Sequence, residues 1–239
     1  MTRPSFDPEA APVVASERLP ALPAAGLTAE RLRLAFQQRS AWTPEAPELP
    51  EAAVAALERP LTAAAVLVPL VMRPDGLSVL LTRRTAHLND HAGQISFPGG
   101  RAEAFDASLV ETALRETREE VGIEADEVEV VGQLHDYVTR TGYRVTPVIG
   151  LLTPPRELRP DPFEVAEVFE TPLAFLMDPA NHETRALTRF EGSVEVKRRF
   201  FAMHWRAGVG DYFIWGATAG MLRDLYRCLA AKGFAVEQS

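Results

Sequence analysis

The sequence predicts an α/β (α+β) fold in which a mixed β-sheet lies between helices. Apolar, β-leaning runs at 62–72 and 77–83 indicate strands. Apolar residues recur at helical spacing at 109–121 and 217–233, which indicates amphipathic helices. Strands and helices do not alternate regularly, so the pattern favours a sheet sandwiched by helices rather than repeated βαβ units.

The first two strands are expected to form a hairpin, because Arg73-Pro74-Asp75-Gly76 between them is typical of a turn. A short helix is expected at 172–178. Further strand candidates, separated by Gly and Pro residues, lie at 126–138, 143–152, 184–190 and 193–205. A chain of 239 residues with 46% hydrophobic content can bury one sizeable core around these elements.

Three segments are expected along the chain. Residues 1–26 are rich in Pro and Ala and predict a flexible leader. Residues 27–60 predict an N-terminal helical attachment, with one helix capped by Thr28 and a second at Pro50–Glu58. Residues 61–239 predict the main domain. The attachment either packs on this domain or forms a homodimer contact.

The charge balance restricts the possible partners. The chain has 25 basic and 33 acidic residues, a formal net charge of −8 and a pI near 5.2. General binding to nucleic acid or to a membrane surface requires a basic field, so we expect neither partner and a small-molecule substrate instead. Cys228 is the only cysteine, which excludes an internal disulfide and favours the cytoplasm. The longest apolar run, Leu61–Met72, is too short to span a bilayer.

The helix expected at 109–121 has defined ends. Ser108 and Glu111 have the form of a capping box, and Gly122 is placed to end the helix. Given about 3.6 residues per turn, one stripe is expected to be buried, consisting of Val110, Ala113, Leu114, Thr117 and Val121. Three carboxylates share an arc away from that stripe, namely Glu116, Glu119 and Glu120.

Two hypotheses account for these like charges on one helix. In the first, the charged run is a solvated face, stabilised by the i,i+4 pairs Glu111–Arg115 and Arg115–Glu119. In the second it is a metal site, because Pro98-Gly99-Gly100 precedes the helix and lets the backbone approach a ligand closely. Oxygen ligands without Cys or His favour Mg²⁺ or Mn²⁺ over zinc. We therefore predict that a divalent cation compensates the carboxylates and bridges phosphate oxygens.

These residues resemble the Nudix hydrolase family, whose box is G-x5-E-x7-R-E-U-x-E-E-x-G-U, where U is aliphatic. Arg115–Ile123 fits the second half of the box, with Thr117 in place of an aliphatic residue. The first half departs from the pattern, since Asp106 takes the acidic position and fourteen residues rather than thirteen separate Gly100 from Arg115. The extra residue falls at the start of the helix, so the catalytic half keeps its spacing.

A second motif resembles the Nudix branch that cleaves coenzyme A (CoA), the CoA pyrophosphatases. That branch carries L-L-T-x-R-S-A and then R-x3-G-x3-F-P-G-G. Leu80–Ala86 fits the first part, with Thr85 for Ser, and Gly93 and Phe97–Gly100 follow at the expected spacing. Asn89 stands where the pattern has Arg, which weakens the CoA assignment. Residues that could replace the lost phosphate contact are Arg83, Arg84 and His91.

The resemblance covers roughly residues 60–230 and implies a Nudix-type α/β/α sandwich. It implies metal-dependent hydrolysis of CoA to 4′-phosphopantetheine and adenosine 3′,5′-bisphosphate. The implied metal ligands are Glu116, Glu119, Glu120 and the backbone carbonyl of Gly100. The same glutamates are the implied catalytic residues, together with Arg115 as a positioning residue and Glu164 or Glu167 as alternatives to a box glutamate as general base. The implied substrate-binding residues are Arg83, Arg84, Gly93, Phe97, Gly99 and Gly100.

Two rival functions stay open within this resemblance. One is hydrolysis of NADH, ADP-ribose or another dinucleotide, which the change at Asn89 allows. The other is nucleotide binding without cleavage, although the presence of all three box glutamates argues against it. Outside the motifs, Arg140 and Arg144 are exposed-loop arginines that could meet a phosphate. Trp215, Phe213 and Cys228 are expected in the core.

Overall fold

The computed structural model describes residues 7–16, 19–38, 41–44, 54, 60–86, 93–155, 157–191, 194–208 and 210–234. The strands are β1 (Val13–Ser16), β2 (Thr62–Arg73), β3 (Gly76–Arg84), β4 (Ile95–Ser96), β5 (Gly99–Arg101), β6 (Val128–Gln133), β7 (Tyr137–Val138), β8 (Tyr143–Leu152), β9 (Val165–Pro172), β10 (Glu183–Glu191), β11 (Val194–Ala207) and β12 (Gly210–Trp215). The helices are α1 (Ala29–Gln37), α3 (Leu109–Val121), α4 (Leu173–Leu176) and α5 (Ala217–Leu229).

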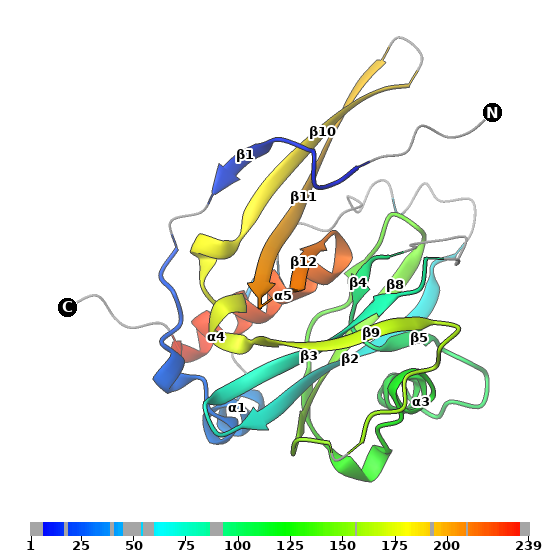
Figure 1. Cartoon of the computed structure of the whole chain (residues 1–239), viewed down its shortest axis with the longest axis vertical. Helices are drawn as coiled ribbons and strands as arrows, with labels where there is room; N and C mark the ends of the chain where they lie inside the picture. Colours follow the sequence, from blue (N-terminus) through cyan, green and yellow to red (C-terminus); the bar gives the residue numbers. More distant parts are fainter. Residues whose placement is uncertain are drawn as a thin grey trace.

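These strands form two sheets with helices packed against them (Figure 1). The larger sheet has the order β4-β3-β2-β8-β6, with β5 paired to β2, β7 to β8 and β9 to β3. Strands β2 and β8 run parallel, whereas β2–β3, β3–β9 and β6–β8 are antiparallel, so the predicted mixed sheet is confirmed. The smaller sheet, β1-β10-β11-β12, was not expected, because the sequence does not say which strands pair.

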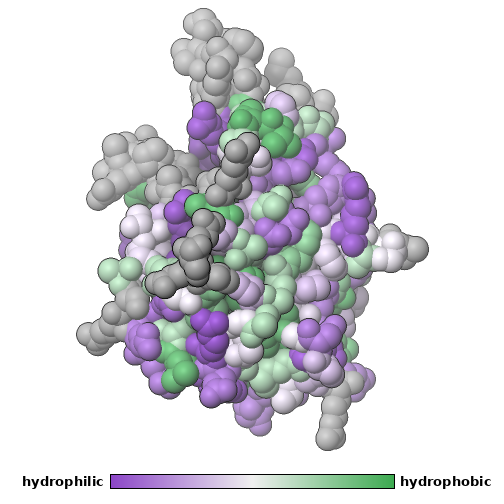
Figure 2. Space-filling view, turned by 90° about the vertical axis from the view of Figure 1, so that its left-hand side faces the viewer, coloured by the Kyte–Doolittle hydropathy of each residue, from purple (hydrophilic) through white to green (hydrophobic). Residues whose placement is uncertain are grey.

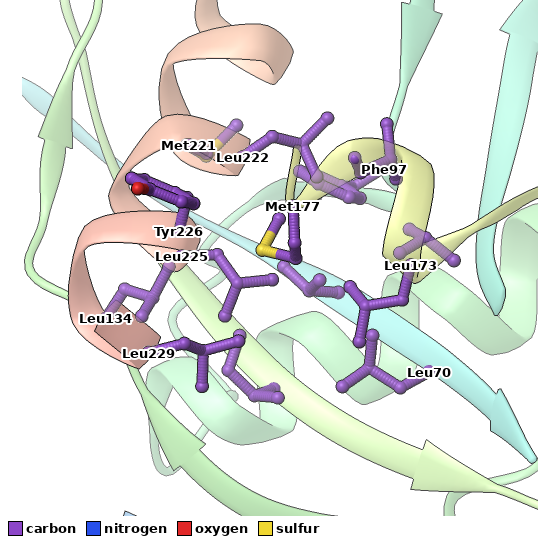
Figure 3. Close-up of a cluster of buried hydrophobic side chains, with 14 of the residues drawn as sticks. Leu70, Phe97, Leu134, Leu173, Met177, Met221, Leu222, Leu225, Tyr226 and Leu229 are labelled. Carbon is purple, nitrogen blue, oxygen red and sulfur yellow. The ribbon is translucent and has the colours of Figure 1, made fainter. Parts of the chain in front are cut away.

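The central strand β2 is buried on both faces, which explains its almost continuous apolar sequence. Its side chains alternate between two clusters, as strand geometry requires. Ala65 and Leu67 pack with Ala113 of α3 on one face. Val68 and Leu70 belong to the main core on the other face, with residues of α4 and α5 (Figure 3). The larger sheet is therefore sandwiched between helices, as predicted.

The hairpin predicted at the start of the domain is confirmed. Strands β2 and β3 pair in the register Leu70↔Val79, and Arg73 pairs with Gly76 across the turn. Gly76 has φ of 130°, a backbone conformation that favours glycine. The turn fixes which residues of β3 face each helix layer, and this decides where the two arginines at the end of β3 lie.

The N-terminal segment packs on the domain over its described part, where the sequence indicated a flexible leader. β1 pairs with β10, and the side chain of Leu22 is buried in the core. The hydroxyl of Tyr226 on α5 donates a 2.7 Å hydrogen bond to the carbonyl of Pro20. Helix α1 begins at the predicted cap, since the Thr28 hydroxyl accepts from the backbone N–H of Arg31. The second helix expected at Pro50–Glu58 lies outside the described residues, apart from residue 54.

Sequence patterns missed β9 and β12, and the short strands β4 and β5. The acidic character of β9 hid it, because its alternating carboxylates suggested a surface segment before a helix. Cys228 is buried as expected, and burial raises the pKa of its thiol to about 11. None of the helices in the described ranges has the length and apolarity needed to cross a membrane. Figure 2 shows hydrophilic and hydrophobic residues interspersed over one face of the molecule.

Candidate active site

Helix α3 has the bounds that the sequence predicted, 109 to 121. The Ser108 hydroxyl accepts a 3.2 Å hydrogen bond from the backbone N–H of Glu111. Gly122 ends the helix in the left-handed conformation, with φ of 76°. The reciprocal half of the capping box is displaced by one residue, since the Glu111 carboxylate accepts from the N–H of Ala107 rather than from that of Ser108.

The three box glutamates differ in their surroundings. Glu119 is exposed, with 52% of its side chain accessible, and Glu116 is half-buried. Glu120 is only 5% exposed. Glu120 is therefore buried although the helical pattern places it away from the apolar stripe. The reason is that β5 packs against this side of α3 and covers the carboxylate.

Glycines at positions 99 and 100 allow this close packing. A Cβ at Gly100 would lie 2.5 Å from the carboxyl carbon of Glu116. A Cβ at Gly99 would lie 2.4 Å from the backbone oxygen of Ala65 on β2, and Gly99 also has φ of 153°. The backbone N–H of Gly99 donates to Glu120 Oε2 at 3.3 Å. The glycine loop and the helix are therefore in direct contact, which is the arrangement that the predicted metal site requires.

Arg115 is the centre of a hydrogen-bond network at the middle of α3. Its Nε and Nη2 donate to the two carboxylate oxygens of Asp106, at 2.9 and 3.0 Å. Its Nη1 donates to Glu116 Oε1 at 2.8 Å and to Glu119 Oε2 at 3.3 Å. The hydrogen bonds from Arg115 hold the pKa of Asp106 well below its usual range, and Asp106 in turn raises the pKa of Arg115. Arginine therefore supplies part of the compensating charge that the sequence required.

A second arginine, Arg84, approaches the buried carboxylate. Its guanidinium lies 3.9 Å from Glu120 and 4.0 Å from Glu164. The loop that carries Glu164 is tied to the end of α3, because the N–H of Asp161 donates to the carbonyl of Glu120 at 2.9 Å. The N–H of Glu164 then donates to the carbonyl of Asp161 at 3.1 Å. These backbone hydrogen bonds hold Glu164, which is distant from α3 in the sequence, close to the box glutamates.

Burial makes the ionised form of these carboxylates costly. It raises the pKa of Glu120 to about 8, with further upward contributions from Glu164 and Glu116 and opposing ones from Arg84 and the Gly99 N–H. Burial also raises the pKa of Glu116, against the effect of Arg115. A cation at this place would favour the ionised forms of both groups.

The residues present fit a hard divalent cation in their chemistry. Glu116, Glu119 and Glu120 supply only carboxylate oxygens, and the backbone of Gly100 lies against Glu116. Such donors suit Mg²⁺ and Mn²⁺ rather than zinc. In the part of the chain that the structure describes, no three acidic, histidine or cysteine side chains are gathered closely enough to form a complete metal site. Glu116 and Glu119 instead bond to Arg115.

Arg83 and Glu167 lie beside each other, away from the box glutamates. Arg83 Nε is 3.6 Å from the Glu167 carboxylate, and Arg83 Nη2 donates to the carbonyl of Asp211. The Tyr212 hydroxyl donates to Glu167 at 2.7 Å. These contacts join β3 and β9 to β12, so the structure favours a structural role for both residues. Of the two candidate bases outside the box, only Glu164 lies near Glu120.

A cavity of about 450 Å³ adjoins the carboxylates. Gly99, Gly100 and Arg84 belong both to its wall and to the carboxylate cluster. The β7–β8 loop lines another part, and the junction of β12 and α5 lines a third. Among its described lining residues are three arginines, Arg84, Arg101 and Arg140, and no acidic residue. The arginines and the absence of acidic residues in the described lining therefore suit an anionic ligand.

Two residues expected in the core lie differently. Phe213 and Trp215 are half-buried, and Trp215 lines the cavity. Their neighbours Tyr212 and Ile214 are the buried ones, because alternate residues of β12 face opposite sides of the sheet. The cavity lining includes Arg140, which the sequence marked as able to meet a phosphate, but also Trp215, Arg101, Thr139 and Thr141, which it did not mark as site residues. No local pattern marks them, since distant parts of the chain bring them together.

The remaining residues predicted to bind substrate lie in different parts of the structure. Phe97 is buried in the main core and also lines the cavity. Gly93 has φ of 71°, and its N–H donates to the carbonyl of Arg84 at 3.2 Å. It thus holds the end of β3 rather than a wall of the cavity. Arg144 is exposed and is not among the described lining residues. Asn89 and His91 lie outside the described residues.

Comparison with known proteins identifies the family. A NUDIX domain profile matches residues 61–190. "Uncharacterized Nudix hydrolase NudL" of Shigella boydii is 43% identical over 162 residues, which is 68% of this chain and 80% of the relative. The relative of that name in Escherichia coli O1:K1 / APEC has the same identity and coverage.

Solved structures resemble the chain at lower sequence identity. A MutT/nudix family protein from Enterococcus faecalis is 21% identical with a TM-score of 0.44, covering 84% of this chain and 69% of that chain. The MutT protein of Methanosarcina mazei Go1 is 24% identical with a TM-score of 0.41, covering 51% and 83%. The profile match spans more than half of the chain, and the NudL relatives are well above 30% identity over most of their length. The chain belongs to the Nudix hydrolase family.

Proposed function

We propose that this Nudix hydrolase cleaves the diphosphate bond of CoA or a CoA derivative, with Mg²⁺ or Mn²⁺. The products would be 4′-phosphopantetheine and adenosine 3′,5′-bisphosphate. The observation that carries the proposal is the shared wall of Gly99, Gly100 and Arg84, which joins the carboxylate cluster to the arginine-lined cavity. A diphosphate at that wall would have carboxylates on one side and room for the rest of the nucleotide on the other.

The residues would divide the work as follows. Glu116, Glu119, Glu120 and the carbonyl of Gly100 would hold the cation. When bound, Mg²⁺ or Mn²⁺ neutralises diphosphate oxygens and lowers the pKa of a water molecule that attacks phosphorus. Arg115 acts as a positioning residue, because its bonds to Asp106 leave Nη1 to restrain the Glu116 carboxylate. We assign Glu164 as the group that accepts the proton of the attacking water, supported by its place beside Arg84 near Glu120.

The CoA branch motif supports the substrate assignment through Leu80–Ala86, Gly93 and Phe97–Gly100. These residues form the end of β3 and the segment that leads into β5, and Arg84 and Phe97 both line the cavity. A second candidate substrate is ADP-ribose or NADH, which the change at Asn89 allows. Either substrate uses the same carboxylates and the same wall.

Product analysis tests the proposal directly. The protein is incubated with Mg²⁺ in ¹⁸O-labelled water and with CoA, ADP-ribose or NADH, and the products are identified by mass spectrometry. We expect CoA to give the two named products, with a single ¹⁸O atom that marks the attacked phosphorus. Equal or faster turnover of ADP-ribose or NADH would overturn the CoA assignment. Absence of turnover of all three would overturn the proposed reaction.

A further inference from the structure

The charge of the cavity differs from that of the whole chain. The chain carries 33 acidic residues against 25 basic ones, yet the described cavity lining contains three arginines and no acid. Two of the three lie on the side of the carboxylates, since Arg84 approaches Glu120 and Arg101 belongs to β5, which packs against α3. Arg84 lies between Glu120 and Glu164, and Arg101 in β5 donates to Glu103 at 3.1 Å. The third, Arg140, comes from the β7–β8 loop.

Hydrogen bonds within the loop that carries Arg140 fix its conformation. The N–H of Thr139 donates to the carbonyl of Tyr143 at 2.9 Å, and the N–H of Tyr143 donates to the Thr139 hydroxyl at 3.1 Å. The hydroxyls of Thr139 and Thr141 lie 2.9 Å apart, and Gly142 supplies φ of 86° for the turn. Arg140 therefore projects from an ordered loop, which lowers the entropy cost of binding a ligand there.

The β7–β8 loop and the carboxylates lie at different positions along β2. The N–H of Thr62, where β2 begins, donates to the carbonyl of Gly142 at 2.9 Å. Further along β2, Val66 pairs with Gly99 beside the carboxylates. Four residues of strand correspond to about 13 Å, so the loop and the Gly99 backbone are anchored at that separation along β2. One phosphate-sized group cannot contact both anchors, but the two ends of a nucleotide can.

We propose that Arg140 binds a second phosphate of the substrate, separate from the diphosphate that is cleaved, and so selects nucleotides with a ribose 3′-phosphate. The inference rests on the proposed function and names the part of CoA that this cavity recognises. Guanidinium forms two-pronged hydrogen bonds with phosphate oxygens, and the hydroxyl-rich loop around Arg140 is compatible with the same group. CoA carries this phosphate, whereas dephospho-CoA, ADP-ribose and NADH lack it.

The first test compares kcat/KM for CoA and dephospho-CoA in the wild type, in Arg140→Ala and in Arg144→Ala. Arg144 is the matched control, since it is an exposed arginine of the adjoining strand outside the described cavity lining. The wild type is expected to prefer CoA. Loss of a charged hydrogen bond at Arg140 should lower that preference by about tenfold or more. Arg144→Ala should keep it, and Arg140→Lys should restore part of it.

The second test measures binding without turnover. Calorimetry with adenosine 3′,5′-bisphosphate and with AMP should show that Arg140→Ala loses affinity for the bisphosphate more than for AMP. An unchanged preference in Arg140→Ala, or an equal loss in Arg144→Ala, overturns the inference. If CoA is not cleaved but Arg140→Ala still loses the preference for the bisphosphate, the proposed reaction fails and the phosphate site stands. If the wild type cleaves CoA and dephospho-CoA equally, the reaction stands and the inference fails.

Discussion

Arg115 donates two hydrogen bonds to the Asp106 carboxylate, from Nε to Oδ1 at 2.9 Å and from Nη2 to Oδ2 at 3.0 Å. This pair ties the segment before α3 to the middle of the helix and leaves Nη1 directed to Glu116. Asp106 occupies the acidic place of the Nudix box, but eight residues separate it from Arg115 where the box has seven. The geometry shows why the shift is tolerated, because the carboxylate still reaches the arginine.

Asp106→Asn should lower activity through a residue that need not touch the substrate. Asparagine keeps the shape but loses the charge that holds Arg115, so Arg115 is free to shift and Glu116 loses its restraint. We expect kcat to fall by about tenfold or more, with KM little changed. Asp126→Asn, at an exposed aspartate, is the control and should behave as the wild type. An Asp106→Asn enzyme with full kcat would contradict this role for Arg115.

The same pair makes a prediction about acid stability. Arg115 lowers the folded-state pKa of Asp106 below that of the unfolded chain. The stabilisation is therefore fully present above the unfolded value, near pH 4, and is lost as the pH falls toward the folded value. Melting temperatures measured from pH 6 down to pH 2 should fall more steeply for the wild type than for Asp106→Asn. Parallel curves for the two proteins would count against the linkage.

The two glycines of β5 should respond differently to alanine. At Gly100 the new methyl group meets only the flexible end of Glu116, so the carboxylate moves while the fold persists. We expect Gly100→Ala to melt near the wild type and to lose about a hundredfold in kcat. At Gly99 it meets the backbone of Ala65 and an unfavourable φ, so Gly99→Ala should cost about 1–3 kcal/mol of folding free energy. Equal stability and equal activity of the two variants would contradict this arrangement.

The elements that the sequence predicted well are those with local causes. The limits of α3 follow from Ser108 and Gly122, and the β2–β3 hairpin follows from the turn at 73–76. The two arginines at the end of β3 show what the alternation of side chains along a strand adds to the prediction. Arg84 shares a face with Leu80, which packs with Val121 of α3, whereas Arg83 shares a face with Leu81 of the main core. Strand periodicity alone therefore contained the signal that Arg84, and not Arg83, approaches the glutamates.

The parts that the sequence did not predict depend on distant segments. Trp215 lines the same cavity as Gly99 and Gly100 because β12 packs against β4 of the larger sheet. Likewise, the helical wheel of α3 placed Glu120 away from the apolar stripe, and it is β5 that buries it. No pattern within α3 reports what covers its polar face. The compensating charges were also undetermined, since an arginine and a divalent cation satisfy the same requirement.

The central claim is that the carboxylates of α3 bind a divalent cation, and metal binding tests it most directly. Titration of Mn²⁺ followed by electron paramagnetic resonance is performed on the wild type, on Glu120→Gln and on Glu111→Gln. Glu111 lies on the same helix but is bonded to Ala107 away from the site, so it is the matched control. We predict that Glu120→Gln weakens Mn²⁺ binding by about tenfold or more while Glu111→Gln binds as the wild type does. Equal Mn²⁺ affinity in all three proteins would contradict the account.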